Sequence, residues 1–146
     1  MKLVGCTAAE VRLVDALCMA RSAKDILLRA HNATECPVGY YTRRWTPPAD
    51  AVAKLDRARE EEARASSELR AALDALRTPL VAGETWKQLQ VEPEVSLVLD
   101  AVSELRRMLG REAVLRERGG RIEGVRIDIA KAERALDGAL RTARAT

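Results

Sequence analysis

A mostly apolar seam recurs at steps of three and four along residues 51–76, and this spacing predicts one long helix. Small and large side chains alternate on the seam, as in coiled coils, so a second helix can approach closely at the small residues. The seam positions are Ala51, Leu55, Ala58, Glu62, Ala65, Leu69, Ala72 and Leu76. Lengthwise packing of helices is therefore the predicted basis of the fold.

A first helix is predicted over residues 8–31, because Thr7 and Glu10 have the spacing of a capping box. The first half of this helix is apolar around most of its circumference, so it requires cover on more than one side. We expect one side to face the bundle and the other to face a loop of the chain or a second molecule. The apolar residues are Val11, Leu13, Val14, Ala16, Leu17, Cys18, Met19 and Ala20.

Two further apolar stripes predict helices over residues 94–118 and 121–144, separated by Gly119 and Gly120. The stripes are nearly in phase across the glycines, so a single helix of about fifty residues is the alternative. Two adjacent glycines inside a helix cost about 2 kcal/mol relative to alanine, which favours a turn.

The sequence therefore predicts an all-α protein, an elongated bundle of about four helices arranged as two antiparallel hairpins in a single domain of residues 1–146. The alternative has three helices, of which the C-terminal one is very long. The predicted helices cover residues 8–31, 47–77, 94–118 and 121–144, with long connections at 32–46 and 78–93. Within the second connection, residues 84–89 are expected to form a short helical turn that packs Trp86 and Leu89 against the bundle. A Trp86 that faces a partner is the alternative.

The first connection holds three of the four aromatic residues of the chain, Tyr40, Tyr41 and Trp45, with Arg43 and Arg44 between them. Such a segment can fold back as a lid over the end of the bundle or bind a protein partner. It can also stack on bases and pair with phosphates, which gives a third alternative.

The net charge of +3 is distributed unevenly. Residues 1–48 carry seven basic and four acidic residues, and residues 119–146 carry six and four. Long runs of one sign are absent from the sequence, which argues against a non-specific nucleic-acid tail. No window approaches the roughly 18 apolar residues of a membrane span, so we expect no membrane insertion.

Three widely spaced cysteines, Cys6, Cys18 and Cys36, do not suggest a disulfide framework. We expect a reducing, intracellular location, or one within a virus particle or large complex, without a signal peptide. Cys18 is interpreted as a small, buried core residue. The single histidine, His31, and the cysteines lack the paired spacing of structural zinc sites, so no metal and no cofactor are expected.

Catalytic motifs are also missing from the sequence: Gly119 and Gly120 do not form a phosphate-binding loop, and a Glu-x-x-His di-metal motif is absent. We therefore expect a non-catalytic structural or interaction protein, a homo-oligomer or a component of a larger assembly. A nucleic-acid-associated protein that uses Arg43, Arg44 and the basic last helix is the first alternative, and a small enzyme or ligand carrier near His31 and Cys36 is the second. The expected partner-binding residues are Val11, Val14, Cys18, Met19, Tyr40, Tyr41, Arg43, Arg44, Trp45 and Trp86.

Overall fold

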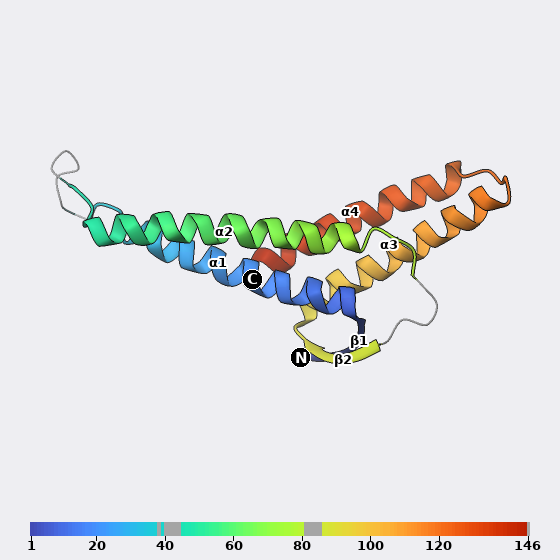
Figure 1. The fold of residues 1–146 in the computed structure, drawn as a ribbon, viewed down its shortest axis with the longest axis horizontal. Coiled ribbons are helices and arrows are strands. Elements are labelled where there is room, and N and C mark those ends of the chain that lie inside the picture. The colour runs from blue at the N-terminus through green and yellow to red at the C-terminus, as the bar shows by residue number, and fades with distance from the viewer. Residues whose placement is uncertain (38, 40–44, 81–85, 146) are drawn as a thin grey trace. The chain divides into compact units, whose positions relative to one another are not determined.

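The computed structural model of the chain describes residues 1–37, 39, 45–80 and 86–145. Over these residues it contains four α-helices and a small two-stranded sheet (Figure 1). The all-α prediction with about four helices is confirmed. The elements are β1 (Lys2–Thr7), α1 (Ala8–Asn32), α2 (Ala49–Ala75), β2 (Trp86–Val91), α3 (Pro93–Glu117) and α4 (Glu123–Ala145).

The chain divides into two compact units. The first, which we call the mixed unit, consists of Met1–Asp15 and Ala71–Thr146. The second, which we call the helical hairpin, consists of Ala16–Arg70 and holds most of α1 and α2. The single domain stays a prediction.

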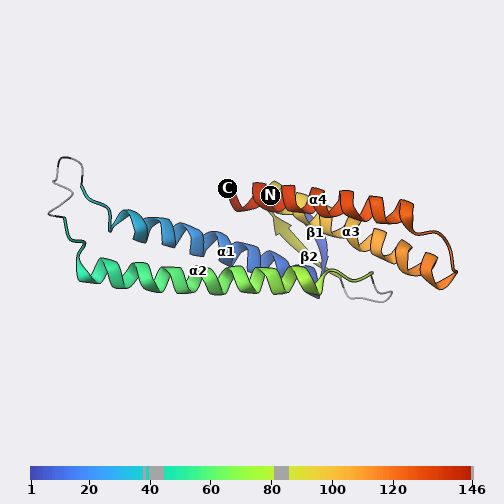
Figure 2. The ribbon, with the colours of Figure 1, turned by 90° about the horizontal axis from the view of Figure 1, so that it is seen from above.

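In the helical hairpin, α1 and α2 run side by side, as both views show (Figure 2). The predicted seam of α2 is the buried side of the helix, and four residues of α1 are buried in the same unit. Ala51 and Glu62 are half-buried, and Glu62 accepts a hydrogen bond of 2.8 Å from the Ser66 hydroxyl. Where the structure describes this unit, its buried residues are Ala16, Leu17, Ala20, Ala23, Leu55, Ala58, Ala65 and Leu69.

In the mixed unit, α3 and α4 form a second hairpin whose turn lies at the two glycines. Gly119 has a φ of 69°, which glycine adopts without the steric penalty of a Cβ. The amide of Gly120 donates to the carbonyl of Leu115 and that of Gly119 donates to the carbonyl of Arg116, which is the Schellman pattern that ends a helix. The turn is therefore confirmed, and the alternative of one very long C-terminal helix is wrong.

The predicted stripes of α3 and α4 supply the core of this hairpin. Most of the buried residues are aliphatic and recur at steps of three, four or seven, as expected for helices that pack lengthwise. They include Val95, Val98, Val102, Leu105, Val125, Ala132, Leu136 and Ala143.

The sheet was not predicted. β1 and β2 pair antiparallel, from Lys2 opposite Val91 to Thr7 opposite Trp86. Val4 and Cys6 share one face with Leu89 and Val91, the face whose residues are the more buried. The expected helical turn at residues 84–89 is therefore wrong for 86–89, because pairing with a distant segment decides the structure of this stretch.

Candidate protein-interaction surface

The helical hairpin carries large apolar side chains that α2 does not cover. Met19 is 58% exposed and Ile26 is 49% exposed, and Cys18 is also exposed. Positions 19 and 26 lie seven residues apart, so they belong to the same side of α1. This unit therefore carries exposed apolar side chains along one side of α1, of which Met19 belongs to the apolar half of the helix that the sequence predicts.

These side chains border a groove between α1 and α2, which we call the hairpin groove. Ala23 and Ala65 are buried beside it and contribute no bulky side chain to its lining. The helix α2 contributes mostly polar and charged residues, whereas α1 contributes mostly apolar ones. The groove is lined by Cys18, Met19, Ser22, Ala23, Ile26, Glu61, Arg64, Ala65, Ser67 and Glu68.

A second depression, with more charged residues in its lining, continues along the same two helices. It shares Ile26 and Glu61 with the hairpin groove and extends to Pro48, the residue before α2. Basic residues from both helices line it, including Arg29 and Lys54. Among the residues that line the two depressions, the large exposed apolar side chains are Met19 and Ile26.

Two of the predicted partner-binding residues, Cys18 and Met19, line the hairpin groove. The interpretation of Cys18 as a buried core residue is wrong, because Cys18 is exposed. The buried residues of α1 recur as Leu13, Ala16 or Leu17, Ala20 and Ala23, and position 18 lies about 100° around the helix from position 17. Ile26 was not predicted, although it lies seven residues after Met19 and therefore on the same side of the helix.

The remaining predicted partner-binding residues lie elsewhere. Val11 and Val14 are half-buried in the mixed unit, where Trp86 is exposed on β2. The indole Nε1 of Trp45 donates to the carbonyl of Thr34 over 3.1 Å, so Trp45 contacts the segment that follows α1. Tyr40, Tyr41, Arg43 and Arg44 lie outside the described residues.

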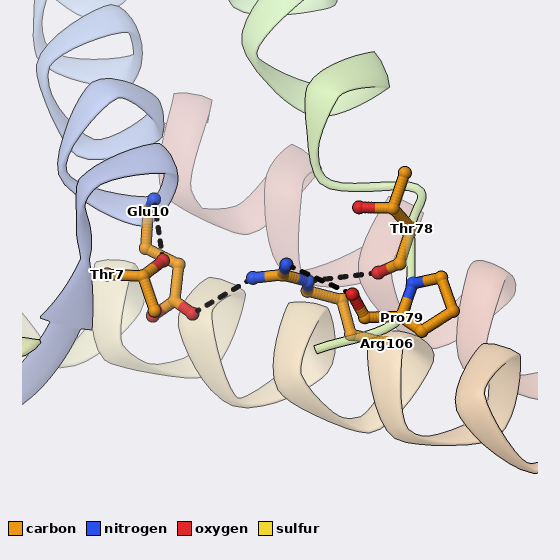
Figure 3. A network of polar contacts seen from close by, with 5 residues as sticks. All are labelled: Thr7, Glu10, Thr78, Pro79 and Arg106. Carbon is orange, nitrogen blue, oxygen red and sulfur yellow. Dashed lines mark hydrogen bonds and ion pairs between the residues drawn. The ribbon is translucent and has the colours of Figure 1, made fainter. Parts of the chain in front are cut away.

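A buried ionic network was missed entirely by the sequence analysis. In the mixed unit, Arg106 of α3 extends between Glu10 of α1 and the segment after α2 (Figure 3). Its Nη1 lies 3.7 Å from Oε1 of Glu10, and its Nε donates to the carbonyl of Thr78 over 3.0 Å. A further hydrogen bond of 3.4 Å runs from Nη2 to the carbonyl of Pro79.

Both charged side chains of this network are almost completely buried, with Glu10 1% and Arg106 3% exposed. The amide of Glu10 also donates to the Thr7 hydroxyl over 3.4 Å, which is one of the two hydrogen bonds of the predicted capping box. Nearby, burial raises the pKa of the Cys6 thiol, and the negative charge of Glu10 raises it further. The network joins three segments of the mixed unit and is best understood as a structural clamp.

The residues considered for metal or nucleophilic chemistry are not gathered into a site. His31 is about half exposed, and its Nε2 lies 3.4 Å from Oε1 of Glu35. Within residues 1–37, 39, 45–80 and 86–145, no group of three or more His, Cys, Asp or Glu residues could hold a metal ion. The basic residues of the last helix are exposed at Arg126, Lys131 and Arg134, so a nucleic-acid role stays a prediction.

Comparison with protein-family models, curated proteins and solved structures gave no match. Of the helices that the structure describes, none is long and apolar enough to cross a membrane.

Proposed function

We propose that this protein is a non-catalytic interaction protein that binds an α-helical segment of a protein partner in the hairpin groove, as a component of a larger assembly. The proposal depends on one observation, the exposure of Met19 and Ile26 beside the groove. Single exposed apolar residues are common on protein surfaces, but large exposed apolar residues that border the same groove are typical of interaction sites.

The position of the groove between two helices that run side by side favours a helix as the ligand. Grooves of this kind take the apolar face of an amphipathic helix, with anchor residues at steps of three, four and seven. Covering the exposed parts of Met19 and Ile26 contributes about 1 kcal/mol each, since full burial of such a side chain is worth about 1.5–3 kcal/mol. Glu61, Arg64 and Glu68 then form a charged rim that selects partners by sign.

Site-directed cross-linking tests this proposal. A photoreactive maleimide is attached to Cys18 in a Cys36→Ser variant, since Cys6 is buried. The labelled full-length chain is irradiated in its native extract, and the cross-linked peptides are sequenced by mass spectrometry. We expect a saturable cross-link from position 18 to a helical segment of one protein.

A groove variant and a matched control variant show whether the cross-link depends on the groove. Met19→Glu with Ile26→Glu should abolish the cross-link, whereas Leu28→Glu should preserve it. Leu28 is 57% exposed on the same helix and does not line the groove. A cross-link that survives the double substitution, or the absence of any saturable cross-link, would show that the groove is not a protein-binding site.

A further inference from the structure

The groove belongs to a unit whose two helices have a thin core. Among the described residues of Ala16–Arg70 eight apolar ones are buried, of which five are alanines and three are the leucines Leu17, Leu55 and Leu69. Alanine buries little apolar surface, so two helices that meet mainly through alanines gain little stability from their own contact. Helical units of this kind are normally completed by further helices, as in four-helix bundles.

The charges of the two helices differ in sign within this unit. Residues 16–32 of α1 carry three basic residues and one acidic residue, whereas residues 49–70 of α2 carry six acidic and five basic ones. A helix that covers the groove therefore lies beside one segment with a net charge of +2 (three basic, one acidic) and one with a net charge of −1 (five basic, six acidic). A second copy of the hairpin meets this requirement, because it presents one helix of each sign.

We propose, on the basis of the function proposed above, that the helical segment bound in the hairpin groove belongs to a second copy of this chain. Two hairpins pack face to face around a two-fold axis parallel to the helices, and they form a four-helix bundle. In this arrangement each α1 lies between its own α2 and the α2 of the second copy. All neighbouring helices are then antiparallel and opposite in net charge, which suits both the helix dipoles and the side-chain charges.

The expected contact area sets the strength of this dimer. The segment of α1 from residue 16 to residue 32 spans about 25 Å, and two adjacent helices are about 20 Å wide. Face-to-face packing therefore buries about 500 Å² on each copy and about 1,000 Å² in total. This area lies at the lower limit for specific interfaces, so we expect a reversible dimer with a dissociation constant in the micromolar range.

Analytical ultracentrifugation of the full-length chain tests the dimer over about 1–300 μM. The weight-average mass should rise from 16.1 kDa toward twice that value. Met19→Glu with Ile26→Glu should weaken dimerisation by about 30-fold or more, since removal of central interface anchors has effects of this size. Leu28→Glu should change it by less than about 3-fold, and circular dichroism checks that each variant remains helical.

A second groove variant blocks the groove and leaves its apolar side chains in place. Ser67→Tyr places a large ring in the groove, where Ser67 is exposed, and should also weaken the dimer by about 10-fold or more. If either groove variant is not helical, the other still decides the outcome. In a mixture of isotopically labelled and unlabelled Cys36→Ser chains, a bis-maleimide should join Cys18 of one copy to Cys18 of the other.

The results separate this inference from the function proposed above. A monomer at 300 μM, or a dimer that tolerates both groove variants, overturns the second copy as occupant. If such a chain still gives the groove-dependent cross-link to another protein, the interaction function stands. If it gives no such cross-link, both proposals are wrong.

Discussion

Removing the guanidinium of Arg106 is the strongest single test of how the mixed unit is held together. Arg106→Met keeps an unbranched side chain of similar length but removes the charge that faces Glu10. The carboxylate of Glu10, a residue that is 1% exposed, then loses the guanidinium that lies 3.7 Å from its Oε1. The carbonyls of Thr78 and Pro79 also lose their hydrogen-bond donors.

The size of the effect follows from this burial. Breaking a buried ion pair by removing one partner typically costs about 3–5 kcal/mol, because a buried charge is left uncompensated. The two carbonyls add little, because Thr78 and Pro79 are exposed and water can replace the lost donors. We therefore expect a loss of about 4 kcal/mol, a large fraction of the roughly 5–15 kcal/mol that stabilises a typical domain.

Urea unfolding followed by circular dichroism measures this loss, and Arg107→Met is the matched control. Arg107 is exposed and pairs with Glu104 over 2.7 Å, so its loss should cost less than about 1 kcal/mol. The double variant Glu10→Met with Arg106→Met should recover much of the stability, because no unpaired charge remains. Equal costs for Arg106→Met and Arg107→Met, or a double variant no more stable than Arg106→Met, would refute the reasoning.

Five further substitutions test the turn, the start of α4, the core and the buried thiol by unfolding measurements. Gly119→Ala should cost about 1–2 kcal/mol, because the φ of 69° is unfavourable for alanine. Gly124→Ala should instead stabilise by about 0.5–1 kcal/mol, because an added Cβ in that helix meets nothing within 4 Å. Leu76→Ala should cost about 2–5 kcal/mol, since the side chain is 2% exposed, whereas the exposed Leu97→Ala should change stability by less than about 0.5 kcal/mol. The raised pKa of Cys6 means that the folded state holds the thiol proton more tightly than the unfolded state does, so stability should fall as the pH rises above about 9, and Cys6→Ala should reduce this fall.

The parts of the fold that the sequence predicted are those fixed by local periodicity. The seam of α2 repeats every seven residues, and its positions from Leu55 to Leu76 are buried apart from the half-buried Glu62. The turn at Gly119 was predictable because a residue with positive φ is usually glycine, and two glycines interrupt an otherwise continuous stripe.

The missed parts depend on contacts between distant segments. Residues 86–91 have no strict alternation of their own, and their strand exists through pairing with Lys2–Thr7. Arg106 lies four residues after Val102, on the apolar stripe of α3. A charged residue at such a position indicates a buried charge, so Arg106 could have been predicted from the sequence. Its acidic partner could not be identified, because the spacing of a capping box does not say what else contacts Glu10.

The pairing of β1 with β2 has a consequence for the order in which the chain folds during its synthesis. The paired residues are separated by 79 to 89 positions, so β1 has no strand partner until the ribosome has released β2. At about 5–20 residues per second, this delay lasts about 4–18 s, much longer than a helix takes to form. Val4 and Cys6 stay without their cross-strand neighbours during this time, so they offer chaperones an early target in the nascent chain.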